Sequence, residues 1–282
     1  MSILVKKNNQ WLPIKNIYSY QNNQWKNIKQ CYAKQSGIWQ SVWQNAIIFI
    51  NDNPQTSVNI FELMGSPTKT GNYIFINNAE ITANYGEPAL KTGIFPKKSK
   101  LTIINNSYIR GYGGDAGNSQ TDGEPGGDAI FLEYPCEINN RNGYLYAGGG
   151  GGGGFYAAYS NNIYKSGGGG GAGSIHGNHG ENHSRPGGTS YYGNNPSPGN
   201  ESTGGIGGYA GYSASGGANT RYDAGAGGDL GEAGMTSKLT SGTSKQIEKL
   251  YAGGAAGLAI NKNNFEVTVL NINEENIKGE IR

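Results

Sequence analysis

The sequence of 282 residues is poor in charge and in sulfur, and it has no long apolar stretch. Charged residues make up 15% and apolar residues 35%, against ~25% and ~45–50% in ordinary proteins. Methionine occurs three times and cysteine twice. This composition supplies too little aliphatic side chain for the core of a large α/β enzyme or a helical bundle, and it excludes both.

The sequence also lacks a cysteine framework, a membrane span and a strong net charge, which narrows where the chain is made and what it binds. Cys31 and Cys136 have no CxxC spacing, so we expect no disulfide framework. The longest apolar run, residues 46–50, is too short to span a bilayer, and the amino terminus lacks the apolar core of a secretory signal. The 22 basic and 20 acidic residues nearly balance, which argues against nucleic acid as the main partner. We therefore expect a chain made in the cytoplasm.

Motifs for phosphate binding and for catalysis are also missing. The segment 65–71 lacks the spacing of a P-loop, and the glycines of 111–117 break the dinucleotide-binding pattern. There is no GxSxG, no HExxH and no cysteine beside a histidine. Asp223, Asp229 and Glu232 are scattered among glycines instead of forming a carboxylate pair. We expect no enzymatic activity and no cofactor.

Glycine is abundant, and its distribution is uneven. Of the 49 glycines, 43 lie in residues 111–257, in short bursts separated by segments rich in Tyr, Asn, Ser and His. One interpretation is a flexible linker. The other is a packed array of left-handed helices of the polyproline II type, which approach closely because glycine has no Cβ. The repeated bursts and the tyrosines between them favour the array, and the lack of a strict G-X-Y period excludes collagen.

The amino-terminal residues contain a 14-residue repeat. NNQWLPIKNIY (8–18) and NNQWKNIKQCY (22–32) align, and residues 36–43 continue the register, so that Trp11, Trp25 and Trp39 match. With Trp43, these are all the tryptophans of the chain. Short Trp/Ile/Tyr runs interrupted by Asn-Asn or Ser-Gly predict strands joined by tight turns.

A second repeat predicts stacked β-coils. YIFINN (73–78) and LTIINN (101–106) share an I-N-N motif, with a looser copy in CEINN (136–140). FEVTVLNI (265–272) predicts one terminal strand. We expect a mostly irregular, all-β fold in four parts: a β-repeat module, a β-rich connecting region, a glycine-rich domain, and a terminal strand with its tail, at residues 1–45, 46–110, 111–257 and 258–282.

The succession LTIINNSYIRGYGGDAG and LYAGGGGGGGFYAAYSNNIYKSGGGGGAG, followed by repeated GGxGG bursts, resembles the tail-fibre tip adhesins of T-even-type bacteriophages over roughly residues 95–257. The resemblance implies a monomer on the distal end of a trimeric long tail fibre, within the virion. It implies a polyglycine II sandwich containing residues 148–154 and 167–173, with loops at its ends. Those loops would contact a host outer-membrane protein or lipopolysaccharide, and are residues 155–166, 174–186, 189–203 and 212–224.

Tyrosine with Ser, Gly and Asn is typical of antibody-like binding loops, although each ring could instead only cover the lattice. Tyr209, inside a glycine burst, is expected to pack. The histidines lie close together in the sequence beside Glu181, but their spacing fits no structural zinc pattern, so we expect a polar receptor-facing loop without metal. The receptor-binding candidates are Tyr156, Tyr159, Tyr164, His176, His179, His183, Tyr191, Tyr192, Asn194 and Arg221.

The tryptophan repeat departs from the family pattern and has three interpretations. Its lysines and tryptophans could stack on single-stranded nucleic acid, or the tryptophans could form the module's own core. The third is docking, in which each unit meets one chain of the trimeric fibre and Trp11, Trp25, Trp39 and Trp43 serve as anchors. We expect docking. For the whole chain, the alternatives to an adhesin are an assembly factor that leaves the fibre and a cell-surface structural protein.

Overall fold

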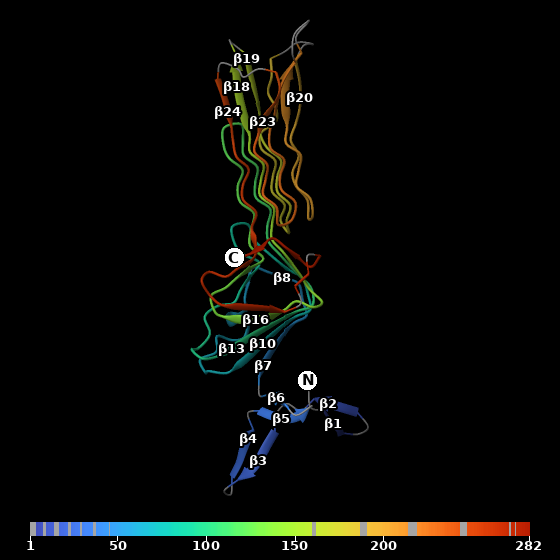
Figure 1. Ribbon diagram of the computed structural model, residues 1–282, viewed down its shortest axis with the longest axis vertical. Helices are drawn as coiled ribbons and strands as arrows, with labels where there is room; N and C mark the ends of the chain where they lie inside the picture. The colour runs from blue at the N-terminus through green and yellow to red at the C-terminus, as the bar shows by residue number, and fades with distance from the viewer. Residues whose placement is uncertain are drawn as a thin grey trace.

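The computed structural model is a mostly β and irregular molecule (Figure 1), which confirms the expected fold class at this level. It describes residues 4–7, 10–13, 17–21, 24–28, 30–35, 38–44, 46–159, 162–186, 191–213, 219–242, 247–270, 272–273 and 275–282. Within these ranges the one helix is α1 (Ile60–Leu63). No helix in the described residues is long and apolar enough to cross a membrane.

The middle of the molecule is a three-sided solenoid of five coils in which all strand pairs are parallel. The first sheet contains β7 (Ile47–Asn51), β10 (Asn72–Asn77), β13 (Lys100–Asn105), β16 (Cys136–Asn139) and β26 (Val267–Leu270). The second contains β8 (Gln55–Thr56), β11 (Ile81–Thr82), β14 (Tyr108–Arg110), β17 (Tyr144–Tyr146) and β27 (Ile277–Lys278). The third contains β9 (Val58–Asn59), β12 (Leu90–Lys91), β15 (Ile130–Phe131), β25 (Leu258–Asn261) and β28 (Glu280–Ile281).

Alternate residues of these strands form a continuous core. Phe75, Ile103 and Ile138 occupy equivalent positions in successive coils and are fully buried. The β-branched and aromatic residues suit this pleated, buried surface. Because no single coil can bury its apolar face, each depends on its neighbours in the stack.

A ladder of buried asparagines follows the I-N-N repeat. Asn51 donates to Asn77, Asn77 to Asn105 and Asn105 to Asn140, at 2.8, 2.9 and 2.8 Å. Matching the I-N-N motifs would stack Asn139 on Asn105, whereas in the structure Asn139 pairs with Ile104 and Asn140 completes the ladder. The looser third copy is therefore shifted by one residue, which preserves the side-chain hydrogen bonds.

The glycine-rich segments leave the solenoid at one corner. Residues 111–129 connect β14 to β15, and residues 147–257 connect β17 to β25, so both insertions lie between the second and the third sheet. The strands after residue 257 complete the fourth and fifth coils. The division into four parts remains a prediction, but hydrogen bonding joins 258–282 to the same sheets as 46–110.

The inserted segments run side by side along the long axis of the molecule (Figure 1). Residues 148–154 are buried and belong to no helix or strand. Their successive N–H groups donate in rotation to three neighbouring segments, 121–127, 169–172 and 232–235. Their carbonyl groups accept in rotation from three others, 251–257, 114–117 and 225–228. Six segments therefore surround this central one.

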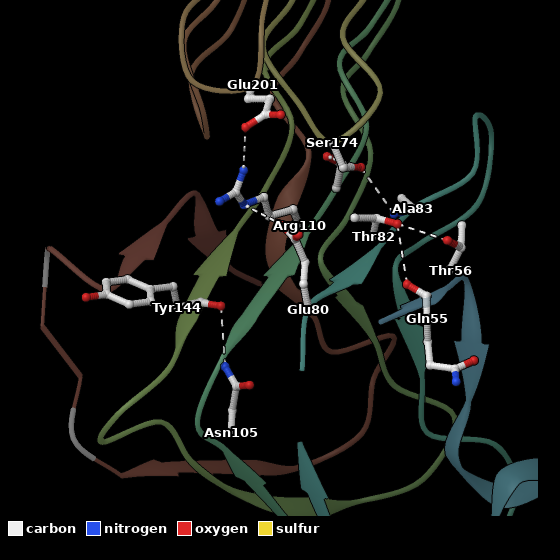
Figure 2. A network of polar contacts seen from close by, with 11 residues as sticks. Gln55, Thr56, Glu80, Thr82, Ala83, Asn105, Arg110, Tyr144, Ser174 and Glu201 are labelled. Atoms are coloured by element: carbon white, nitrogen blue, oxygen red, sulfur yellow. Dashed lines mark hydrogen bonds and ion pairs between the residues drawn. The ribbon is translucent and has the colours of Figure 1, made fainter. Parts of the chain in front are cut away.

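The base of the glycine-rich block is fastened to the solenoid (Figure 2). The Arg110 Nε lies 3.3 Å from a Glu80 oxygen, and an Arg110 terminal nitrogen lies 3.5 Å from a Glu201 oxygen. Ser174 Oγ accepts from the Ala83 N–H at 3.2 Å and donates to the Gly111 carbonyl. Turns of the block thus contact Arg110 of β14 and Ala83, the residue that follows β11.

The amino-terminal repeat forms three antiparallel hairpins. Their strands are β1 (Leu4–Lys7) with β2 (Gln10–Pro13), β3 (Ile17–Gln21) with β4 (Gln24–Ile28), and β5 (Gln30–Gln35) with β6 (Ile38–Gln44). The prediction of repeated strands is confirmed, and the expected turn residues lie outside the described ranges. Cys31 and Cys136 are both free thiols.

Candidate functional site

At the end of the molecule farthest from the hairpins, the glycine-rich segments continue into two small antiparallel sheets (Figure 1). The three-stranded sheet contains β18 (Phe155–Tyr159), β19 (Asn162–Ser166) and β24 (Ile247–Leu250). The four-stranded sheet contains β20 (Tyr191–Asn194), β21 (Tyr209–Tyr212), β22 (Thr220–Asp223) and β23 (Lys238–Ser241). Together we name these two sheets the tip.

The inner faces of the tip sheets form an aromatic core. The rings of Phe155 and Tyr222 are 5.6 Å apart, and Tyr191 lies 6.1 Å from Tyr164 and 5.2 Å from Tyr212. Tyr164 is 4% exposed, and burial raises its pKa to about 12. Of the binding candidates, Tyr164 and Tyr191 therefore contribute to the packing of this core, and their role in receptor binding stays a prediction.

The outer face of the four-stranded sheet gathers three of the binding candidates. Tyr192 and Asn194 on β20 pair with Gly211 and Tyr209, and Arg221 on β22 also pairs with Gly211. The Arg221 guanidinium lies 4.0 Å from the centre of the Tyr209 ring, and its Nε lies 2.5 Å from an Asp223 oxygen.

This arrangement fixes the aromatic rings of the face. A Cβ on Gly211 would overlap the Tyr192 ring, so the missing side chain allows this tyrosine to lie flat across β21. The rings of Tyr192 and Tyr209 are 6.2 Å apart. Tyr209, which the sequence predicts to pack, is half-buried under Arg221 on this same face. We name Tyr192, Asn194, Tyr209 and Arg221 the tyrosine–arginine face.

The three-stranded sheet carries two further candidates. Tyr156 is half-buried and pairs with Lys165 on one side and Lys249 on the other. Tyr159 is the last residue of β18 and pairs with Asn162, and the position of its side chain lies outside what is described.

The three histidines do not come together. His176 and His179 are exposed, and their segment runs along the block, where the N–H groups of Gly177 and Gly180 donate to Gly171 and Gly168. His183 Nδ1 lies 2.6 Å from Asn195 Oδ1. Within the described residues, no three His, Cys, Asp or Glu side chains are placed to hold a metal ion. Within the expected loop at 174–186, residues 177–180 therefore run along the glycine-rich block.

Glu181 stabilises this segment from the side. Burial alone would raise the pKa of its carboxyl group, but hydrogen bonds from Ser119 and Lys165, and the charge of Lys165 at 3.1 Å, outweigh burial and lower the pKa. The sequence does hold a signal for the lattice here, since Gly177 and Gly180 are three residues apart, as are Gly114 and Gly117.

The tryptophans occupy one repeated position in the hairpins. Trp11 pairs with Lys6, Trp25 with Tyr20 and Trp39 with Lys34, each at the same place in its hairpin. Trp43 pairs with Cys31 farther along β6. The positions of these indole rings lie outside what is described, so the choice between core and docking stays a prediction.

Comparison with known proteins decides the class of protein. The model of the family described as phage tail fibre adhesin Gp38 matches residues 17–282. The chain belongs to this family. It is an adhesin of a phage tail fibre, a component of the virion that mediates receptor binding without catalysis. The predictions of an adhesin function, of a non-enzymatic protein and of a place in the virion are therefore confirmed. The family match favours the adhesin over an assembly factor.

A solved structure with the same fold supports the architecture. The adhesin is similar to the crystal structure of the gp37–gp38 adhesin tip complex of the bacteriophage S16 long tail fibre, with a TM-score of 0.50 and 23% identity. The similarity covers 85% of this chain and 83% of that one. A search of curated proteins returned no match.

Proposed function

We propose that the adhesin sits at the distal tip of a long tail fibre and binds an outer-membrane protein or lipopolysaccharide of the host through the tyrosine–arginine face. The observation that carries this proposal is the gathering of Tyr192, Tyr209 and Arg221 on one outer sheet face at the end farthest from the hairpins. Tyrosine and arginine are enriched in binding hot spots, and a pre-positioned ring loses little entropy on binding.

Binding of a fluorescent fusion to a panel of Gram-negative cells tests this proposal, with single outer-membrane-protein deletions and truncated-lipopolysaccharide strains included. We expect Tyr192→Ala and Arg221→Ala to weaken binding about thirtyfold, as loss of a hot-spot residue does. Tyr85→Ala and Arg282→Ala remove an exposed tyrosine and an exposed arginine elsewhere, and should bind as the parent does. Equal binding by all four variants would contradict the assignment of this face.

We infer that the glycine-rich segments are polyglycine II helices. A helix with three residues per turn points successive N–H groups in three directions, 120° apart. The rotation of partners along residues 148–154, and glycines spaced by three in the surrounding segments, support this geometry. Residues 167–173 make a similar rotation of bonds. Fibre diffraction or vibrational spectra of the isolated domain would separate this conformation from β-sheet.

We also propose that the three hairpins attach one adhesin monomer to a trimeric fibre, each hairpin meeting one fibre chain. The equivalent positions of Trp11, Trp25 and Trp39 in three successive hairpins support this match of symmetries. Replacing all three by Ala should abolish co-purification with the fibre trimer while cell binding is retained. Co-purification of the triple variant would refute it.

A further inference from the structure

The first coil of the solenoid has an open core. Ile47 lies in register with Tyr73, which is 1% exposed, yet Ile47 itself is 52% exposed. Phe49 stacks on the fully buried Phe75 at 5.9 Å and is only partly buried. These side chains lie on the core face of the first sheet, in register with the buried Tyr73 and Phe75, yet Ile47 is mostly exposed and Phe49 is only partly buried.

The strand that carries them also has a free edge. β7, β8 and β9 are the outermost strands of the three sheets, and no described strand pairs with their outer side. β7 has five residues, IIFIN, with no charge and no proline, and its other face exposes Ile48 at 56% and Ile50 at 51%. Natural proteins protect long edge strands with charges, prolines or a cover. β7 has neither a charge nor a proline, so we expect another element to cover it.

We propose that the distal end of the trimeric tail fibre is this cover, and that it docks on the first coil along the axis of the solenoid. Three features point to this occupant. β7 follows the hairpins after only residues 45 and 46. β7 lies on the side of the solenoid that faces the hairpins (Figure 1). Its three edges, one from each sheet, match the three chains of a trimer. The inference rests on fibre attachment by the hairpins and extends that interface onto the solenoid.

The test uses the full-length adhesin bound to the carboxy-terminal fragment of the fibre protein of the same phage. Dissociation is followed by biolayer interferometry for Ile47→Lys, Ile48→Lys and the control Ile94→Lys, whose side chain is 71% exposed elsewhere on the solenoid. We expect Ile47→Lys and Ile48→Lys to speed dissociation at least tenfold, because each buries a charge in an apolar contact. Ile94→Lys should dissociate as the parent does, and all three should bind cells equally.

A second measurement does not depend on the variants folding. In the unmodified protein, hydrogen exchange of the β7 amides should slow when the fibre fragment binds, since a covered edge exchanges more slowly. Unchanged exchange in β7 on fibre binding would overturn docking on the solenoid. So would unchanged dissociation of both β7 variants when the triple tryptophan variant fails to bind, and that result would leave attachment by the hairpins standing. A triple tryptophan variant that still binds would instead refute the hairpin attachment.

Discussion

Each glycine from 148 to 154 faces a carbonyl oxygen of another segment at the place where a side chain would begin. Two fully surrounded segments, 148–154 and 167–173, are accordingly almost all glycine, whereas the segments around them carry glycine at intervals. The density of glycine in a run therefore reflects how many neighbours the run has. This relation accounts for the uneven bursts better than flexibility does.

A single methyl group should reveal this packing. A Cβ at Gly151 would overlap the carbonyl oxygen of Asp115, so Gly151→Ala must push two backbone segments apart. We expect it to destabilise the protein by about 1–3 kcal/mol. A Cβ at Gly71 would meet only Tyr73 ring atoms at 3.6 Å, so Gly71→Ala should change stability by about 0.5 kcal/mol or less. Urea unfolding of both variants checks the contrast, and equal losses would contradict it.

The lowered pKa of Glu181 predicts how the stability of the glycine-rich block changes in acid. Its pKa in the folded protein lies below that in the unfolded chain, so its contribution is complete above the unfolded value, about 4.3 for Glu. It is lost as the pH falls through the lower folded value. Melting temperatures between pH 7 and pH 3 should fall less steeply for Glu181→Gln than for the parent. Parallel curves would show that this carboxylate does not contribute.

At the scale of the element, the sequence predicts repeats better than it predicts register. The 14-residue spacing of the tryptophans corresponds to hairpins, and the I-N-N motifs correspond to stacked strands. The choice of Asn140 over Asn139 could not be predicted, because it depends on which amide reaches Asn105. The placement of Tyr192, Tyr209 and Arg221 on one sheet face could not be predicted from the sequence either, because it depends on pairing between distant segments.

The asparagine ladder predicts that the loss of stability on substitution depends on the position in the ladder. Asn77 accepts from Asn51 and donates to Asn105, and all three side chains are buried. Asn77→Ala leaves polar groups unpaired on both sides and should cost about 2–4 kcal/mol, since one such group costs about 1–3 kcal/mol. Asn51→Ala, at the end of the ladder, affects only one neighbour and should cost about half as much. Thermal unfolding measures the ratio, and equal costs would contradict the ladder.

At the scale of the whole molecule, the tip belongs to an insertion in a solenoid, and the strands that follow the insertion complete the fourth and fifth coils. In the second coil, residues 83–89 join the same two sheets that the large insertion joins in the fourth coil. We expect a chain in which copies of 83–89 replace both 111–129 and 147–257 to fold as a solenoid, to retain fibre attachment and to lose cell binding. Circular dichroism and pull-down with the fibre fragment test this, and an unfolded product would show that the solenoid needs the block.

The rotation of hydrogen bonds around residues 148–154 also has a mechanical consequence. The segments run along the long axis, and their bonds lie across it. A pull applied to the tip therefore loads these bonds in shear, many at a time, instead of breaking them one after another. Because the two insertions are joined to β14 and β15 of the third coil and to β17 and β25 of the fourth, the load is shared among four strands at the base. The glycine-rich block is thus suited to work as a tether under tension while the virion stays attached.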